Sequence, residues 1–512
     1  MTNFLYEITQ PSDANFQLTL ADNSILDCQR VVRVIAQKRL VCQAIWQGKA
    51  VYVKLFLDTE ANKYAARDAK GVALLKQANI NTPSLLCKTE LIDKSAQADK
   101  VAQVLIFEAI VSENNAPAKN VEQIWPTLSQ NARLDLAQKL VIEVSKHHNA
   151  GLLQTDLYLK NFLVENDKIY TLDGDGIRQF THLSPKQALQ NLATLWSKFD
   201  VLDIEKWQQS LAKTYVDISI LNIVFAPDKL TKLANFHRLK VASHYADKKV
   251  FRTCTDVMVK SLRGDFFALN TQFLQTNIES SRDTYDEMIK QSEPLLKNGN
   301  SATVAKIDIN NQAFVLKRYN IKNAWHGLRR ALRPSRAAAS WANAYRLQLL
   351  GIATAKPVAL LETRRFRLRG KAYFISEYID SPDVAQYFAQ IKNKTDRAEA
   401  VKNIVTLFYK LYLLQISHGD LKASNIKIQG AQPVLIDLDS MRQHSYGYFA
   451  QKAHVRDLKR FMQNWLKQPA LYNAFVKTFK VIYDDTTVLQ QAGIDQNKEI
   501  SHKEISHKEI SE

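Results

Sequence analysis

Two sets of polar residues follow the same order and spacing in the two halves of the chain. Each set is an aspartate, an asparagine and a second aspartate: Asp156, Asn161 and Asp173, then Asp420, Asn425 and Asp437. The asparagine follows the first aspartate by five positions, and the second aspartate follows the asparagine by twelve, in both sets. Kinase-type phosphoryl transfer uses one carboxylate to orient the acceptor hydroxyl, and an amide and a carboxylate to hold magnesium. We therefore expect Asp156 and Asp420 to be catalytic and the other four residues to bind the metal.

A lysine precedes each set at a matching distance. Lys54 lies in the run 51–56 and Lys317 in the run 314–319, and both runs are rich in the β-branched and aromatic residues typical of strands. Each lysine is expected to bind the phosphates of a nucleotide from such a strand. The lysine and the three residues of each set thus repeat at an offset of 263 or 264 residues. An internal repeat of this kind predicts two kinase-like domains in tandem.

Three further residues of the second half are candidates for the same site. Lys422, two positions after Asp420, can neutralise charge on the transferring group. Gly299 lies in the segment 298–303, which could form a tight turn over the phosphates, although a plain hairpin turn fits the segment equally well. Glu377, in the strand expected over 373–378, is a candidate cofactor-binding residue.

The acidic partners of the two lysines differ. A kinase fold pairs its phosphate-binding lysine with a glutamate on the following helix. The helix expected over 335–350 contains no acid for Lys317, whereas Asp68, on the helix expected over 60–78, is a possible but short partner for Lys54. The first half also has no glycine-rich loop, and Tyr158 stands where the second half has Lys422. Both an active first domain and a structural or substrate-holding pseudokinase therefore stay open.

The order of elements supports one fold class for both halves. An antiparallel sheet, a helix, a hinge and a helical segment that leads into the catalytic loop are expected in each. The predicted fold class is α+β, with tandem, bilobal, eukaryotic-like protein kinase folds. We expect a first kinase-like domain over 1–240, a helical connector or the start of the second domain over 241–290, a second kinase-like domain over 291–495 and a low-complexity tail over 496–512.

The composition indicates an anionic partner. The 512 residues carry a net charge of +18, and basic residues concentrate in the segments 317–336 and 364–371. Such a field attracts anionic lipid or glycolipid, although plain solvated basic surface remains possible. No nucleic-acid-binding module accompanies the charge, and no structural metal is expected. No membrane span or signal peptide is expected, and the four separated cysteines indicate reduced thiols in the cytoplasm.

The second half resembles the lipopolysaccharide kinase family, whose members phosphorylate heptose or Kdo sugars of the lipopolysaccharide inner core. The segments that carry the resemblance are 317–323, 332–337, 340–344, 351–354, His418-Gly419-Asp420-Leu421-Lys422 and Leu435-Ile436-Asp437-Leu438-Asp439. The resemblance implies ATP with Mg²⁺, a sugar hydroxyl as acceptor, an anionic glycolipid partner and peripheral work at the cytoplasmic face of the inner membrane.

Other functions remain open from the residues alone. Gly419 stands where regulated protein kinases carry an arginine, and no A-P-E segment follows Asp437, so a small or glycan substrate is favoured over a protein. A Ser/Thr protein kinase, a small-molecule phosphotransferase and a pseudokinase scaffold in envelope glycolipid assembly are the alternatives.

Overall fold

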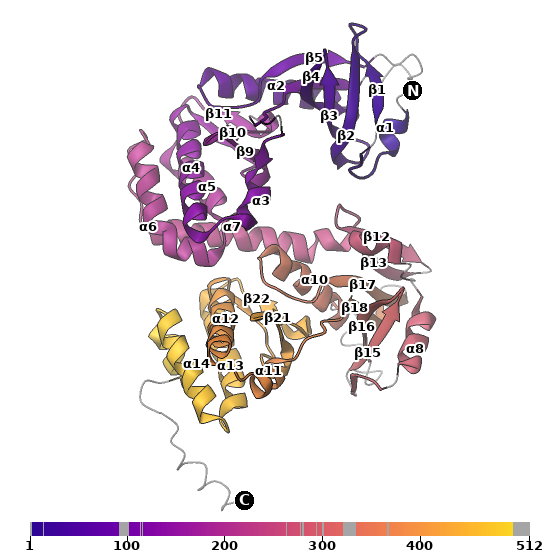
Figure 1. Ribbon diagram of the computed structural model, residues 1–512, viewed down its shortest axis with the longest axis vertical. Coiled ribbons are helices and arrows are strands. Elements are labelled where there is room, and N and C mark those ends of the chain that lie inside the picture. Colours follow the sequence, from indigo (N-terminus) through magenta and orange to yellow (C-terminus); the bar gives the residue numbers. More distant parts are fainter. Residues whose placement is uncertain are drawn as a thin grey trace, which may run out of the picture. The chain divides into compact units, whose positions relative to one another are not determined.

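The computed structural model describes residues 3–13, 15–91, 102–112, 114, 116–262, 264–276, 278, 281–292, 294–299, 302–320, 334–365 and 368–494. It divides into two compact units, Met1–Arg238 and Leu239–Glu512, and each is α+β. Within each unit the strands of the large sheet lie together and most of the longer helices gather apart from them (Figure 1). Among the described residues, no helix combines the length and the apolar character needed to cross a membrane.

The sheet of the first unit is six-stranded and antiparallel, in the order β1-β2-β3-β4-β6-β5. Its strands are β1 (Phe16–Thr19), β2 (Ile25–Ile35), β3 (Arg39–Trp46), β4 (Lys49–Phe56), β5 (Leu85–Glu90) and β6 (Gln103–Glu108). Alternate residues of β3 and β4 face a buried core that includes Leu40, Val53 and Leu55. The other face therefore remains for α2 (Ala61–Gln77), which follows β4, and for the catalytic loop.

The rest of the first unit is mainly helical. Its helices are α1 (Asn3–Glu7), α3 (Val121–Ile124), α4 (Gln130–Asn149), α5 (Pro185–Trp196), α6 (Val201–Ile218) and the start of α7 (Pro227–Asp247). Its short strands are β7 (Lys119–Asn120), β8 (Leu152–Gln154), β9 (Phe162–Glu165), β10 (Lys168–Thr171) and β11 (Ile177–Gln179). Ser129 caps α4 through a hydrogen bond from the Ala132 N–H. Helix α4 ends at Asn149 and so delivers the chain to the loop of Asp156.

The second unit contains a seven-stranded sheet in the order β12-β13-β17-β18-β16-β15-β14. Its strands are β12 (Val257–Leu262), β13 (Asp265–Asn270), β14 (Lys297–Asn298), β15 (Ala302–Ile309), β16 (Gln312–Tyr319), β17 (Pro357–Arg365) and β18 (Leu368–Glu377). The helices are α8 (Arg282–Gln291), α10 (Arg336–Leu349), α11 (Val384–Gln390), α12 (Lys394–Leu413), α13 (Gly447–Met462), α14 (Pro469–Ile482) and α15 (Thr486–Gln491). Short strands β19 (Ile416–Ser417), β20 (Ile426–Gln429), β21 (Gln432–Leu435) and β22 (Arg442–Gln443) flank the catalytic loop.

The segment 241–290, expected to be a helical connector or the start of the second domain, lies in the second unit and is less helical than expected. Among its described residues, the α-helical ones are the end of α7 and most of α8, because 257–270 forms the hairpin β12–β13, which pairs with β17 of the large sheet. The alternating Val257, Val259 and Phe267 of this hairpin are typical of strands, and the tertiary pairing satisfies their backbone groups. The expected tail over 496–512 lies outside the described residues.

Candidate functional site

Strand β16 places Lys317 against two carboxylates in the second unit. The Lys317 ammonium contacts Asp437, and its Nζ lies 3.3 Å from Oδ2 of Asp439. Burial lowers the pKa of Lys317, but the neighbouring Tyr319, Asp437 and Asp439 raise it more, so that the net pKa lies above its usual value. The pKa of Asp437 lies below its usual value because the attraction of Lys317 outweighs the effect of burial. Both side chains are therefore charged at neutral pH.

Asp439, which lies in the loop after Asp437, takes the place of an acidic residue on helix α10. Its carboxylate is only 3% exposed and lies 2.7 Å from the Arg336 guanidinium, at the start of α10, as well as near Lys317. The Asn343 amide of the same helix donates to the backbone carbonyls of Leu438 (2.9 Å) and Met441 (3.0 Å). Helix α10 is thus held against the loop after Asp437 through a cation and an amide, without a helix carboxylate.

The loop that follows β19 positions Asp420 and Asn425 side by side. The Asn425 amide donates to the Asp420 carbonyl (2.8 Å) and to the Asp420 carboxylate (3.2 Å). Two cations face the same carboxylate: Arg460 of α13 at 2.5 Å and Lys422 at 3.9 Å. The Ile436 N–H donates to the Asn425 carbonyl (3.0 Å) and so connects this loop to Asp437.

A buried aspartate of α13 fixes the backbone just before Asp420. The Asp457 carboxylate accepts from the N–H groups of His418 (2.6 Å) and Gly419 (3.0 Å). Burial raises the pKa of Asp457 to about 6. Gly419 has a φ of +79°, and a Cβ added there would lie 2.7 Å from the Ser440 carbonyl oxygen. Glycine is therefore required at this position for the shape of the loop.

The hairpin β14–β15 brings another cation to the Lys317 strand. Lys297 pairs with Val304, and Val304 pairs with Lys317, so the two lysines lie in one row across three strands. The Gly299 N–H closes the hairpin turn onto the Ala302 carbonyl (3.1 Å). Residues 300 and 301 of the expected phosphate-covering turn lie outside the described residues.

Glu377 has different contacts. It ends β18, where it pairs with Phe314 three positions before Lys317, and its carboxylate lies 3.6 Å from the Lys356 ammonium. The structure thus gathers Lys317, Asp437 and Asp439 at one point and leaves Glu377 with another partner. Its predicted role in cofactor binding remains a prediction.

The first unit repeats the arrangement with a helix acid in place. Nζ of Lys54 lies 2.5 Å from the buried Asp68 carboxylate and 3.1 Å from Asp173. Asp68 therefore contacts Lys54, as the sequence suggested despite its short side chain. Burial lowers the pKa of Lys54, but the two aspartates raise it more. The nearby Asp175 contacts Arg67 of the same helix, α2.

The carboxylate of Asp156 has a different set of neighbours from that of Asp420. Burial and the charge of Asp173 raise its pKa, which Lys160 and Lys198 partly offset. The Lys198 ammonium lies 4.1 Å from the centre of the Tyr158 ring, and that of Lys160 lies 5.3 Å from it. Positive charge near Asp156 thus comes from two lysines that also contact the Tyr158 ring.

The donor sets fit a magnesium ion that also binds phosphates. The amide nitrogens of Asn161 and Asn425 donate to backbone carbonyls, which leaves their amide oxygens as acceptors. Each asparagine has an aspartate partner, and Mg²⁺ is usually held by one or two carboxylates together with substrate phosphates. Across the described ranges, no group of three or more His, Cys, Asp and Glu could hold a metal alone. A phosphate-assisted magnesium site fits these residues.

Several residues near the candidate site were not predicted from the sequence. Asp457 lies 37 positions after Asp420, and Arg460 follows on the same helix face, so only the folded α13 brings them to the loop. The internal repeat offered one signal, because Lys198 and Arg460 are separated by 262 residues, close to the offset of the other marks. The position of Lys297 beside Lys317 depends on strand register, which no sequence signal indicated.

The basic clusters are partly neutralised within the chain. Arg318 and Lys371 lie 2.9 and 3.3 Å from Asp286 of α8, and Arg364 lies 2.6 Å from Glu362. Five other cluster residues lie outside the described residues: Lys322, Arg329, Arg330, Arg333 and Arg367.

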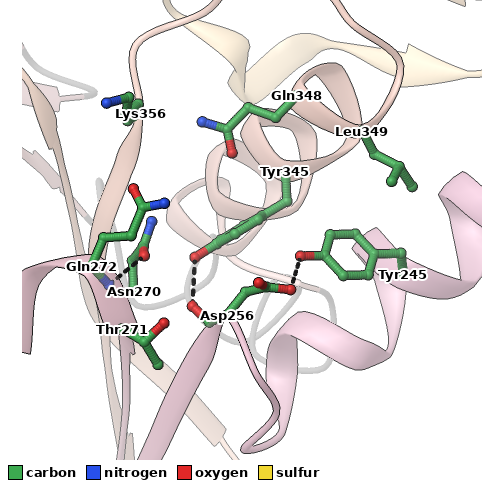
Figure 2. A pocket seen from close by; sticks show the side chains of 9 residues that line it. All are labelled: Tyr245, Asp256, Asn270, Thr271, Gln272, Tyr345, Gln348, Leu349 and Lys356. Atoms are coloured by element: carbon green, nitrogen blue, oxygen red, sulfur yellow. Dashed lines mark hydrogen bonds between the residues drawn. The ribbon is translucent and has the colours of Figure 1, made fainter. Parts of the chain in front are cut away.

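A cavity of about 310 Å³ in the second unit lies away from these residues. Figure 2 shows Tyr345, Gln348 and Leu349 of α10 on one side of it, and the hydrogen bond from the Tyr245 hydroxyl to Asp256 (2.6 Å) at its edge. Asn343 and Tyr345 are two positions apart and so point to nearly opposite faces of the helix. The cavity therefore lies behind α10 and not at the Asp437 loop.

Comparisons with known proteins find a similarity within the second unit. No match appears among the curated proteins. A solved structure described as "WaaP in complex with acyl carrier protein" is 14% identical and covers 48% of this chain and 99% of that chain, with a TM-score of 0.31. Residues 290–483, which include Lys317, Asp420, Asn425 and Asp437, match the lipopolysaccharide kinase (Kdo/WaaP) family. The resemblance predicted from the sequence is therefore confirmed over residues 290–483, the part of the chain that is similar to the lipopolysaccharide kinase (Kdo/WaaP) family.

Proposed function

We propose that the second unit transfers the γ-phosphoryl group of magnesium-bound ATP to a sugar hydroxyl, on heptose or Kdo, of the lipopolysaccharide inner core. The observation that carries this proposal is the family match over residues 290–483. The contacts that join Lys317 to Asp437, and Asn425 to Asp420, support it, because a kinase needs these four groups at one place.

Lys317 is suited to bind the phosphates. Its raised pKa keeps the ammonium charged at neutral pH. Its partner Asp437 would bind magnesium, and the ammonium would then contact the phosphates that the same magnesium ion binds. Asn425 and Asp437 would hold magnesium, which supplies charge neutralisation for the phosphate oxygens during transfer. Lys297, in the same row as Lys317, adds a second cation on the nucleotide side.

Asp420 would receive the acceptor hydroxyl. Its carboxylate is fixed by the Asn425 amide and by the backbone that Asp457 holds, so its orientation does not depend on the substrate. Lys422 and Arg460 lie beside it and can offset negative charge on the transferring group. Positioning and electrostatics supply most of the catalysis in this class of reaction.

The acceptor that fits the charge is an anionic glycolipid at the cytoplasmic face of the inner membrane. The net charge of +18 favours association with an anionic surface. We infer peripheral association and no nucleic-acid partner.

Phosphate transfer by the purified chain tests the proposal. The full chain is incubated with Mg²⁺, γ-labelled ATP and inner-core glycolipid whose phosphates have been removed. The wild type is expected to label the glycolipid, and Asp420→Asn is expected to lose the labelling by a factor of 10² or more. Asp484→Asn, at an exposed position of the same unit, is the matched control. Labelling of a peptide substrate but not of the glycolipid would favour a protein kinase, and labelling by neither would leave the scaffold function.

A further inference from the structure

The first unit carries a second copy of the row of cations that the site of the second unit uses. Three residues lie opposite one another across neighbouring strands in each unit, and they are Arg33, Val41 and Lys54 in the first unit and Lys297, Val304 and Lys317 in the second. Strand residues that are directly paired point to the same face of a sheet. Arg33 and Lys54 therefore share the face of the sheet that does not pack on the core of Leu40, Val53 and Leu55.

The hairpin that contains Arg33 takes the place of a glycine-rich loop. Its turn, residues 36–38, is held by hydrogen bonds from the Lys38 N–H to the Ile35 carbonyl (2.9 Å) and from the Leu57 N–H to the Lys38 carbonyl (2.8 Å). Arg39, just after the turn, pairs with Phe56 and so lies on the same face as Lys54. Backbone amides of a glycine-rich turn are thus replaced by two guanidinium groups next to the phosphate-binding lysine.

The catalytic loop of the first unit has the same internal hydrogen bonds as that of the second. The Asn161 amide donates to the Asp156 carbonyl (2.7 Å), and the Leu172 N–H donates to the Asn161 carbonyl (2.8 Å). Asp173 adopts a left-handed backbone conformation with a φ of 66°, and Asp437 has a φ of 61°. A non-glycine residue is uncommon in this conformation, which indicates that both loops are shaped for the same task.

Helix α2 is locked against this loop. A Cβ added at Gly71 would lie 1.9 Å from the Gly174 carbonyl oxygen, and one added at Gly174 would lie 2.3 Å from the Asp68 carbonyl oxygen. Two glycines therefore allow a backbone contact that holds Asp68 beside Lys54 and Asp173. The first unit thus has its lysine, helix acid and metal-side aspartate already assembled.

We propose that the first unit holds a second site for a magnesium-bound nucleoside triphosphate, in which Arg33 and Lys54 bind the phosphates and Asn161 and Asp173 hold the metal. This site is separate from the kinase site of the second unit and goes beyond the proposed function.

Nucleotide binding to the full chain tests this proposal. Isothermal titration calorimetry with Mg²⁺ and a non-hydrolysable ATP analogue is expected to give two nucleotides per chain. Asp173→Asn is expected to remove one of them and Asp437→Asn the other, while Asp167→Asn, at an exposed position of the first unit, leaves both. Circular dichroism and thermal unfolding show that each variant is folded.

The outcomes separate this proposal from the proposed function. A stoichiometry of one that Asp437→Asn abolishes and Asp173→Asn leaves intact would overturn the second site alone. A stoichiometry of one with the opposite response would keep the second site and refute the kinase site.

The role of Arg33 has its own control. Arg33→Ala is expected to weaken binding at the first-unit site about tenfold, whereas Lys49→Ala, about 17 Å from Lys54 along β4, is expected to leave it unchanged. Equal affinities for the two variants would refute the phosphate contact of Arg33.

Discussion

Replacing Asp439 by asparagine removes the charge that holds Lys317 and Arg336 together. The Asp439 carboxylate is 3% exposed and lies 2.7 Å from Arg336 and 3.3 Å from Lys317. Asparagine has nearly the same size, so the substitution changes charge and not packing. Breaking a buried ion pair costs about 3–5 kcal/mol when it leaves a buried charge without a partner. Lys317 keeps Asp437, and Arg336, 31% exposed, can turn toward water, so we expect a cost of about 2–3 kcal/mol at this site.

The corresponding substitution in the first unit is a matched control. Asp175 is 21% exposed, and its partner Arg67 is 39% exposed, so Asp175→Asn is expected to cost about 0.5–1 kcal/mol. The two costs differ because Lys54 has its own buried acid, Asp68, whereas Lys317 depends on the loop.

Native-state hydrogen exchange measures both effects within one chain. Asp439→Asn is expected to lower the opening free energy of peptides from α10 by about 2–3 kcal/mol and to leave peptides from α2 unchanged. Asp175→Asn is expected to affect only α2. Opening free energies of α10 that fall by less than 0.5 kcal/mol would refute the idea that Asp439 replaces the missing helix acid.

Three further predictions concern a pH-dependent contact, a phosphate ligand and a packing contact. Asp457 ionises near pH 6 in the folded chain, above its unfolded value of about 3.8, so its stabilising contribution is complete below pH 4 and is lost as the pH rises through 6. The unfolding free energy of the wild type relative to Asp457→Asn should therefore fall by about 3 kcal/mol between pH 4 and pH 7 in denaturant titrations, and a constant difference would refute the assignment. Lys317→Met should raise the KM for ATP at least tenfold in the transfer assay, because the phosphates lose a charged partner, and an unchanged KM would remove Lys317 from the nucleotide site. Gly71→Ala should speed hydrogen exchange in α2 by forcing the helix away from Gly174, at a cost of about 1–3 kcal/mol, and unchanged protection would show that no such contact exists.

Local patterns were enough to predict which polar groups the structure brings together in the second unit. The five-residue spacing from Asp420 to Asn425 fits within one loop, and Lys317 lies in a run whose composition is typical of a strand. The repeat at a nearly constant offset placed the same groups in the first half. The contact of Asp68 with Lys54 was also anticipated, because the helix directly follows the lysine strand.

Long-range geometry determined the parts that the sequence analysis missed. Asp439 contacts Lys317 because the loop after Asp437 packs against α10. No spacing in the sequence indicates that the acidic partner of Lys317 lies in this loop and not on the helix. The contact of Asp457 with the Gly419 backbone depends on the packing of α13. The segment of β12 and β13 was expected to be helical, and this prediction was wrong. The pairing of β13 with β17, which stabilises these strands, joins residues far apart in the sequence.

The phosphate content of the inner core shows whether this protein phosphorylates that core in cells. Lipopolysaccharide from cells that lack this protein is compared by mass spectrometry with that from cells that express the wild type or Asp420→Asn. We expect the core of the deleted strain to lack phosphate on a heptose or Kdo residue, and we expect the wild type but not the variant to restore it. A core with the same phosphate content in all three strains would contradict this expectation.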